Sequence, residues 1–149
     1  MSVLISNRQN KTKISRQSLR KTAQAVLNAS GCPESELSIL ILDDPQIAVL
    51  NKEYLNREGP TNVIAFPMHE GEFPNLNPEL LGDVVISVET AQKEGEATGI
   101  SMEARFTELL VHGILHLLGY DHEKTEEEAI RMENKSSEIL KRIAEEMAV

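Results

Sequence analysis

The stretch that decides the interpretation of this chain reads HGILHLLGYDH and runs from His112 to His122. It contains three of the chain's four histidines. His112 and His116 are four residues apart, so on a helix their side chains would lie one turn apart on the same face. Gly119 favours the left-handed conformation that ends helices, which would let His122 turn back toward the other two. We therefore expect a helix followed by a tight turn, with three imidazoles close enough to share one metal ion.

Three histidines are the ligand set of a catalytic zinc site, in which a fourth position stays open for water. We expect one Zn²⁺ per chain at His112, His116 and His122, although imidazole also binds nickel, copper and iron, so the sequence leaves the metal open. Two other interpretations remain. The three rings could share a surface without a metal, with mutual repulsion whenever two of them are protonated. A structural zinc would need a fourth protein ligand, for which Cys32, His69 or a carboxylate is available.

The histidine spacing also matches the zinc-peptidase pattern H-E-x-x-H-x-x-G-x-x-H, except that Gly113 stands where these peptidases have their catalytic Glu. A glycine cannot accept a proton, so the metal ligands are kept while the general base is missing. A peptidase or amidohydrolase is therefore the alternative only if another carboxylate, such as Glu108 or Glu123, supplies the base. A metal-dependent hydrolase with a different substrate is the better match.

Three segments together resemble one known family. They are the histidine stretch, the segment PTNVIAFP at residues 60–67 and the segment LGDVVI at residues 81–86. In order and separation they are similar to the YbeY family, bacterial metal-dependent endoribonucleases that act in ribosomal RNA maturation. The resemblance implies hydrolysis of single-stranded RNA at the 3′ end of 16S rRNA, a part in ribosome quality control, and binding to the ribosome or ribosomal proteins. The attacking group, hydroxide or the ribose 2′-hydroxyl, stays open.

One residue of the family pattern is displaced in this chain. Members of the family usually carry a functional Arg directly after the aromatic residue that precedes the PT[ND]V segment. Here Leu55 follows Tyr54, and Arg57 comes two residues later. We expect the Arg57 guanidinium to bind a phosphate of the substrate and to be the catalytic residue of this loop. Ala65 replaces a Ser often found in the segment, which removes one hydroxyl.

Other side chains near these segments have weaker assignments. Asp121 either accepts a hydrogen bond from a ligand imidazole or caps the turn after the helix. Tyr120 either stacks on a base or packs at the helix end. We expect Asp83 to point inward, where it would pin a loop or approach the site, and His69 to lie on the surface.

The length of 149 residues is typical of one globular domain, and we expect residues 1–149 to form a single metallohydrolase domain. Cys32 is the only cysteine, which excludes an internal disulfide and fits a reducing compartment. The first thirty residues contain no secretory signal, and no apolar run approaches the roughly 20 residues that span a bilayer. We therefore expect a cytoplasmic protein without membrane contact.

The net charge of −9 is unusual for a nucleic-acid-binding protein, because such proteins rely on Lys and Arg. The charges are unevenly distributed: residues 1–33 hold basic side chains and no acid, whereas all 24 acidic residues lie from Glu34 onward. A basic N-terminal face opposite an acidic C-terminal helix would suit an RNA-facing polarity. Two solvated faces without such a role explain the pattern equally well.

The hydrophobic periodicity predicts an α+β fold, with a small mixed four-stranded sheet, about five helices and the metal site on a helix-turn. Asp44 is the expected N-cap of the second helix, and the last two strands are expected to pair in an antiparallel, hairpin-like way. We expect strands at residues 2–6, 36–42, 62–66 and 82–88, helices at 15–29, 44–56, 89–97, 101–118 and from 125 onward, and a long loop at 68–79.

Overall fold

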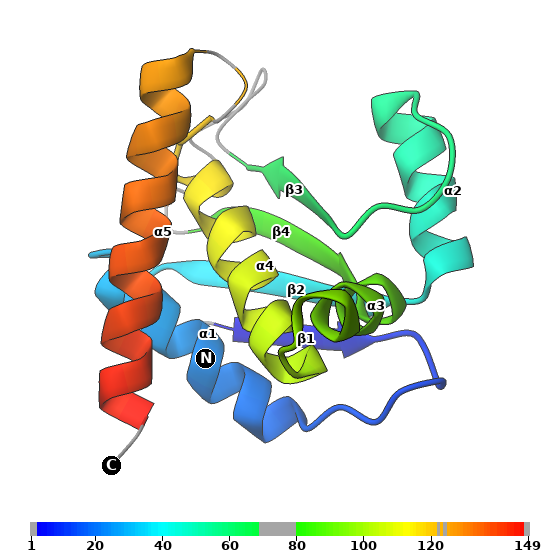
Figure 1. Cartoon of the computed structure of the whole chain (residues 1–149), viewed down its shortest axis with the longest axis horizontal. Coiled ribbons are helices and arrows are strands. Elements are labelled where there is room, and N and C mark those ends of the chain that lie inside the picture. Colours follow the sequence, from blue (N-terminus) through cyan, green and yellow to red (C-terminus); the bar gives the residue numbers. More distant parts are fainter. Residues whose placement is uncertain (1–2, 69–79, 122, 124, 148–149) are drawn as a thin grey trace.

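A computed structural model gives the fold and describes residues 3–68, 80–121, 123 and 125–147. The order of strands and helices is the predicted one, with bounds that differ from the prediction by at most two residues (Figure 1). The predicted loop at 68–79 lies outside the described residues, apart from Met68. The elements are β1 (Val3–Asn7), α1 (Arg16–Ala29), β2 (Glu36–Leu42), α2 (Asp44–Leu55), β3 (Val63–Pro67), β4 (Leu80–Ser87), α3 (Val88–Thr98), α4 (Met102–Leu117) and α5 (Glu126–Met147).

The strands form one mixed sheet in the order β1-β2-β4-β3. β1, β2 and β4 run parallel, and β3 pairs with β4 in the antiparallel direction. The predicted hairpin-like pairing is confirmed, with Ile64 opposite Val85. The α+β class and the mixed four-stranded sheet are confirmed as well. Among the described strands β3 lies at the edge of the sheet, beside the segments that build the site described below.

The larger core lies on the face of the sheet that α1, α4 and α5 cover (Figure 1). α4 places Phe106, Leu110 and Ile114 in this core, together with Ile39 and Ile86 of the sheet. Burial of apolar surface on this scale is the main stabilising contribution to the fold. It fixes α4 across the sheet and thereby fixes the direction in which its remaining faces point.

A smaller core lies on the other face of the sheet, under α2. It consists of Leu42, Ile47, Ile64 and Val85. Successive residues of a strand point to opposite faces, so the neighbours of Ile64 in β3 face the α4 side. β3 therefore contributes to both faces of the molecule at its open edge.

The second helix is capped one residue earlier than predicted. Asp43, not Asp44, is the N-cap: its carboxylate accepts a 3.0 Å hydrogen bond from the backbone N–H of Gln46. The Gln46 side chain accepts in turn from the backbone N–H of Asp43, which completes a capping box. Either Asp can be a cap in sequence terms, and the Gln three residues after Asp43 is the signal that distinguishes them.

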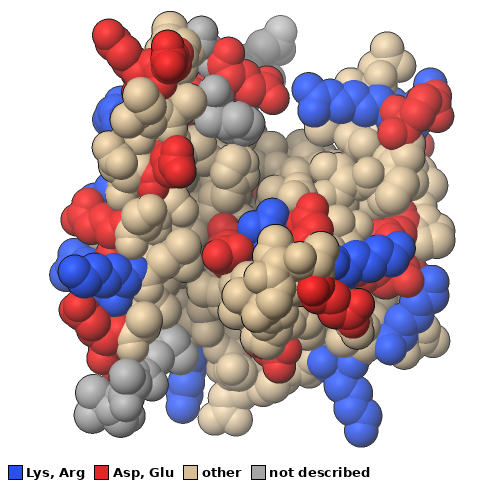
Figure 2. All heavy atoms as spheres, in the orientation of Figure 1, with Lys and Arg blue, Asp and Glu red and all other residues tan. Residues whose placement is uncertain are grey.

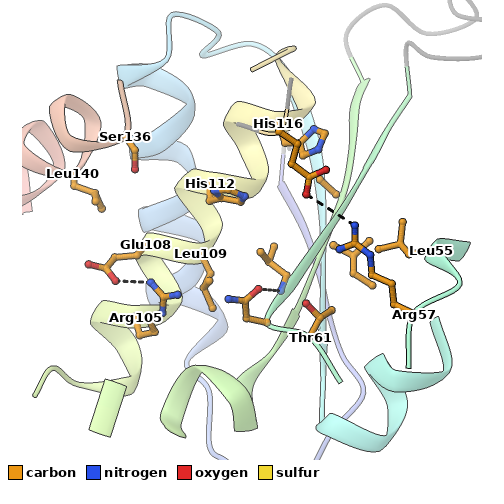
Figure 3. Close-up of a pocket in the computed structure, with 15 residues that line it drawn as sticks. Leu55, Arg57, Thr61, Arg105, Glu108, Leu109, His112, His116, Ser136 and Leu140 are labelled. Carbon is orange, nitrogen blue, oxygen red and sulfur yellow. Dashed lines mark hydrogen bonds and ion pairs between the residues drawn. The ribbon is translucent and has the colours of Figure 1, made fainter. Parts of the chain in front are cut away.

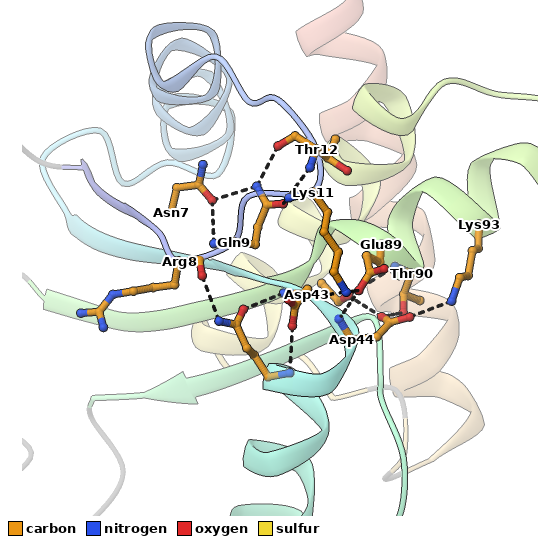
Figure 4. A network of polar contacts seen from close by, with 12 residues as sticks. Asn7, Arg8, Gln9, Lys11, Thr12, Asp43, Asp44, Glu89, Thr90 and Lys93 are labelled. Carbon is orange, nitrogen blue, oxygen red and sulfur yellow. Dashed lines mark hydrogen bonds and ion pairs between the residues drawn. The ribbon is translucent and has the colours of Figure 1, made fainter.

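Asp44, freed from capping, joins α2 to α3 (Figure 4). Its carboxylate accepts hydrogen bonds from Ser87 Oγ at 2.6 Å and from Thr90 Oγ1 at 2.5 Å, and it lies 2.9 Å from Lys93 Nζ. Partial burial raises the pKa of Asp44, but the hydrogen bonds from Lys93, Ser87 and Thr90 outweigh it and leave the pKa below its usual value. The charged form of this carboxylate is therefore part of the folded structure.

Two expectations about polar residues are wrong. α1, which carries Arg16, Arg20 and Lys21, packs against α5 rather than opposite it. The basic and acidic segments are thus neighbours, and Figure 2 shows acidic side chains gathered over α5. Asp83 is exposed on β4 rather than pointing inward. Among the described residues, no helix is both long and apolar enough to cross a membrane.

Candidate active site

A pocket of about 580 Å³ opens beside the edge strand β3. α4, α5, β3 and the loop after α2 build its walls, and Figure 2 shows this face hollowed between α5 and the end of α2. Figure 3 shows the lining side chains. They are Leu55, Arg57, Thr61, Asn62, Val63, Ile64, Ala65, Arg105, Glu108, Leu109, His112, His116, Glu123, Ser136 and Leu140. The histidine helix and the PTNV segment, which are far apart in sequence, therefore meet in one pocket.

α4 positions the first two histidines. Ser101 caps its start by accepting a 3.0 Å hydrogen bond from the backbone N–H of Ala104. His112 and His116 follow on the pocket side, each partly buried, and the opposite side of the helix enters the large core. The two imidazoles thus share one helical face and one pocket, as the four-residue spacing predicts.

Gly113 sets how closely α4 approaches the sheet. A Cβ atom at this position would stand 2.7 Å from Val84 Cγ1 and 3.4 Å from Val63 Cγ2. The 2.7 Å distance is shorter than real Cβ contacts, so any other residue here would require the Val84 side chain, the helix or the strand to shift. The position that holds the general base in the zinc peptidases is here a packing contact with β4. This gives a second, steric reason for the absence of a Glu at residue 113.

Gly119 ends the helix in the predicted way. It has φ +103°, and the backbone N–H groups of Gly119 and Tyr120 donate to the carbonyls of His116 and Leu115, each at 3.0 Å. After this turn the chain returns to the pocket, since Glu123 is among the lining residues. His122 lies outside the described residues, so its part in the site stays a prediction.

The two alternatives for Tyr120 and Asp121 are now separated in part. Tyr120 packs against the large core, and the guanidinium carbon of Arg131 lies 4.7 Å from the centre of its ring. Asp121 Oδ1 accepts a 2.8 Å hydrogen bond from the backbone N–H of Glu123. Tyr120 therefore packs at the helix end and Asp121 caps the turn. A hydrogen bond from Asp121 to a ligand imidazole stays a prediction.

Arg57 borders the pocket from the side opposite the histidines (Figure 3). Its Nη2 lies 4.0 Å from Glu123 Oε1, and both side chains are well exposed. Ion pairs between exposed groups contribute little, about 0–1 kcal/mol, so an anionic ligand can displace this one. Arg57, although shifted by two positions along the sequence from the family pattern, thus lines the same pocket as His112 and His116.

Asn51 holds the loop that carries Arg57. Its side chain is 3% exposed, and its Nδ2 donates a 2.9 Å hydrogen bond to the carbonyl of Gly59. Its backbone carbonyl accepts from the backbone N–H of Arg57 at 3.2 Å. Asn56 between them adopts the left-handed conformation, with φ +53°, which turns the chain out of α2. Sequence reasoning missed Asn51, because nothing in the helical pattern of α2 distinguishes it from a solvated Asn.

Sequence reasoning named Glu108 but missed the group of charges to which it belongs at one end of the pocket. Arg105 Nε donates to Glu94 Oε1 and its Nη1 donates to Glu108 Oε1, each at 2.9 Å, and Asn62 Nδ2 donates to Glu94 at 3.3 Å. Burial lowers the pKa of Arg105, but these carboxylates more than compensate and raise it. The i,i+3 spacing of Arg105 and Glu108 is a signal that the sequence does contain. Glu94 is on α3, and only the fold brings it here.

The chemical type of the side chains in the described part of the pocket suits a divalent cation. Two imidazoles in one pocket are the donor chemistry that zinc and related metals prefer. Within the described part of the chain, no group of three or more His, Cys, Asp or Glu side chains is arranged to hold an ion. His69 and His122 lie outside that part. Cys32, suggested above as a fourth ligand, follows α1 and does not line the pocket.

Comparisons with known proteins point in one direction. Residues 4–144 match the family model described as Endoribonuclease YbeY. The chain is 52% identical over 143 residues to an Endoribonuclease YbeY from Syntrophotalea carbinolica, covering 95% of each protein. It is 53% identical over 140 residues to the Endoribonuclease YbeY of Geobacter metallireducens, covering 93% of each. The fold resembles the solution structure of TM1509 from Thermotoga maritima, with a TM-score of 0.68, 20% identity, and coverage of 98% of this chain and 91% of the other.

Proposed function

The chain belongs to the YbeY family of endoribonucleases, and we propose that it is a metal-dependent endoribonuclease specific for single-stranded RNA. Its endoribonuclease class follows from that membership, with RNA as the substrate. The requirement for a metal, the preference for single strands and the residues responsible are the proposal. We further propose that residues 1–149 act as one domain.

The observation that carries this proposal is the convergence of His112, His116 and Arg57 on one pocket. The two histidines come from α4 and the arginine from the loop after α2. Cleavage of a phosphodiester needs a cationic group at the phosphate and a way to stabilise charge as it develops there. In this proposal, Arg57 and a cation held by the histidines supply that combination.

We propose His112, His116 and His122 as the ligands of one divalent cation, with Zn²⁺ as the first choice. The first two line the pocket, and the return of the chain to the pocket at Glu123 supports the third. When bound there, the cation would supply Lewis acidity toward a phosphoryl oxygen and lower the pKa of a coordinated water. Gly113 leaves the peptidase position without its carboxylate. Glu108 and Glu123, the other candidate bases, line the pocket but are paired with Arg105 and Arg57, which fits a substrate other than a peptide.

In this proposal Arg57 binds a non-bridging oxygen of the phosphate that is cleaved. The guanidinium now lies 4.0 Å from Glu123, and a phosphate would replace that carboxylate. A guanidinium can form two parallel hydrogen bonds to a phosphate, which fixes the orientation of the group as well as its charge. Asn51 keeps this loop in place through its hydrogen bond to Gly59.

The biological setting is also part of the proposal. We place the chain in the cytoplasm, in maturation of the 3′ end of 16S rRNA and in ribosome quality control, with the ribosome or ribosomal proteins as partners. A chain with a net charge of −9 has weak general attraction for RNA. Affinity supplied by the ribosome or its proteins would compensate for this charge.

The direct test compares His112→Ala and His116→Ala with the wild type. We expect both to lose metal content by mass spectrometry and to lose cleavage of a single-stranded RNA at equal metal concentration. Glu103→Gln is the matched control, because Glu103 lies at the exposed start of the same helix and does not line this pocket. If His116→Ala cleaves RNA as fast as the wild type, the proposed metal site is not the source of activity. Turnover of peptides without RNA cleavage would favour the alternative metallohydrolase.

A further inference from the structure

Tyr54, at the end of α2, is an aromatic side chain whose exposure the fold does not explain. It is 63% exposed, whereas Phe106 is 1% exposed in the core and Tyr120 packs against the core. Among the aromatic side chains that the structure describes, Tyr54 alone is largely exposed. An aromatic side chain with most of its ring in solvent is a common feature of surfaces that bind single-stranded nucleic acid.

The ring of Tyr54 is held in place although it is exposed. It meets Phe66 of β3 edge-on, with ring centres 5.4 Å apart and an angle of 77° between the rings. Such edge-to-face pairs are a preferred aromatic geometry and restrict the side chain. Phe66 itself packs on the smaller core. A ring fixed in this way loses little conformational entropy when a ligand stacks on it.

The aromatic pair borders the pocket around the edge of β3: neither ring lines the pocket, and Phe66 lies on the α2 face of the sheet with Ile64. Leu55, the residue after Tyr54, lines the pocket and is 44% exposed, and Arg57 lines it two residues later. In β3, which forms the rest of this wall, Ala65 lines the pocket and Phe66 is the next residue. The two segments that carry the aromatic rings are therefore the same two that form the wall of the pocket opposite the histidines.

We propose that Tyr54, supported by Phe66, is a stacking subsite for one unpaired nucleobase next to the phosphodiester that is cleaved. This inference rests on the proposed function, and it names the feature that selects single strands. A base in a duplex has both of its faces covered by neighbouring bases, whereas a splayed base in a single strand offers a face to an aromatic ring. Stacking tolerates any base, so the subsite selects for strand state rather than for sequence. Arg57 binds the backbone phosphate while Tyr54 binds the base beside it.

Variants at residue 54 distinguish base stacking by Tyr54 from apolar packing of Tyr54 on Phe66. Tyr54→Phe keeps a flat ring, whereas Tyr54→Leu keeps apolar bulk over Phe66 without one. We expect the KM for single-stranded RNA to rise about 5- to 100-fold in Tyr54→Ala and Tyr54→Leu, with kcat within about 2-fold of wild type. Tyr54→Phe should stay near wild type. Val49→Ala is the matched control, because Val49 is an exposed apolar residue of the same helix that lies outside the pocket lining.

A scan of abasic positions in the RNA provides the second measurement. In wild type, removal of one base at a single position beside the cleaved bond should weaken binding by the same factor as Tyr54→Ala. In the Tyr54→Ala background the same abasic position should have no further effect, because the two changes remove one contact. Thermal denaturation of Tyr54→Leu should match wild type, which excludes loss of folding as the cause.

A spectroscopic measurement follows from the composition. The chain has two tyrosines and no tryptophan, so its fluorescence comes from Tyr54 and Tyr120. Saturation with a short single-stranded RNA, corrected for RNA absorbance, should quench part of the emission in wild type. The quenched part should be missing in Tyr54→Phe although this variant still binds.

Three outcomes would overturn the subsite. The first is a KM in Tyr54→Ala equal to that of wild type. The second is that removal of the base still weakens binding in Tyr54→Ala. The third is that the variants change the oligomeric state and leave the affinity for RNA unchanged. If wild type cleaves RNA while any of these is found, the proposed function stands and only the subsite is lost. If wild type neither binds nor cleaves single-stranded RNA, both are lost.

Discussion

The side-chain amide of Asn51, buried in α2, donates a 2.9 Å hydrogen bond to the carbonyl oxygen of Gly59 in the loop that leads to β3. Arg57 lies between these two residues, and its backbone N–H is bound by the carbonyl of Asn51. The position of the guanidinium in the pocket therefore depends on a residue that does not line the pocket. In the proposed site, Arg57 would contact the RNA, whereas Asn51 would position Arg57 without contacting the RNA itself.

Asn51→Ala should lower both stability and cleavage. Loss of the hydrogen bond leaves the Gly59 carbonyl without its partner, which costs about 1–3 kcal/mol in the free energy of unfolding. The freed loop should lower kcat/KM for RNA about 10-fold, since a displaced catalytic group costs one to two orders of magnitude. Urea unfolding and steady-state cleavage measure the two effects. Asn56→Gly is the control, because glycine tolerates the left-handed backbone at that position. Unchanged cleavage in a destabilised Asn51→Ala would show that Asn51 has a purely structural role.

Gly113→Ala should destabilise the protein by about 1–3 kcal/mol, because the added methyl group would overlap Val84. The higher helix propensity of Ala, worth about 1 kcal/mol, would offset part of this penalty. Val84→Ala alone creates a cavity, but in combination with Gly113→Ala it should cost less than the sum of the two single changes. A double-mutant cycle by chemical denaturation measures this coupling. Simple additivity would contradict the close approach of α4 to β4.

Asp44→Asn should weaken the fold at neutral pH and lose this effect in acid. The folded-state pKa of Asp44 is depressed, so its contribution is present above the unfolded-state pKa, near 3.9, and is lost as the pH falls through the lower folded-state value. The variant should be about 1–2 kcal/mol less stable than wild type at pH 7. As the pH falls through the lower folded-state pKa, the difference should shrink toward zero. Denaturation curves across this range provide the measurement, and a difference independent of pH would contradict the assignment.

Arg57→Ala should lower kcat/KM for RNA by about 100-fold if the guanidinium stabilises charge at the cleaved phosphate. Arg57→Lys should restore only part of the loss, because an ammonium group cannot make the paired contact. Lys52→Ala is the control: Lys52 is a nearby exposed cation that pairs with Glu58 and lies outside the pocket lining. Equal losses in Lys52→Ala and Arg57→Ala would mean that only the general surface charge matters.

Glu123→Gln should raise the affinity for RNA about 2- to 5-fold, because it removes the carboxylate that competes with phosphate for Arg57. The gain should be largest at low salt and should vanish in an Arg57→Ala background. Glu127→Gln, an exposed change at the start of α5, controls for the loss of one negative charge. RNA binding measured by fluorescence anisotropy at two salt concentrations distinguishes these cases.

The regular elements were predictable because their signals are local. The spacing of His112 and His116 and the position of Gly119 predict α4, its pocket face and its end. Gln46, three residues after Asp43, is the local signal of the capping box, and the one-residue error in the N-cap concealed the link from Asp44 to α3. The apolar pattern around Asp83 did not determine which side of β4 is covered.

The contacts that complete the pocket are not local, so the sequence did not predict them. Arg105 meets Glu94 only because α3 and α4 pack together, and Asn51 meets Gly59 only because the loop folds back on α2. The shift of Arg57 relative to the family pattern could be read in the sequence. Its arrival in the pocket depended on the left-handed turn at Asn56.

The order of the strands in the sheet has a consequence for synthesis of the protein. Within the described sheet, β3 pairs with β4 alone, which follows it in the chain, and the histidines on α4 are translated later still. A growing polypeptide that has not yet emerged as far as Leu117 cannot bring His116 to Arg57, whatever its earlier parts have folded into. The proposed site can therefore assemble only after most of the protein has been synthesised, so a nascent chain would acquire its proposed activity late in translation.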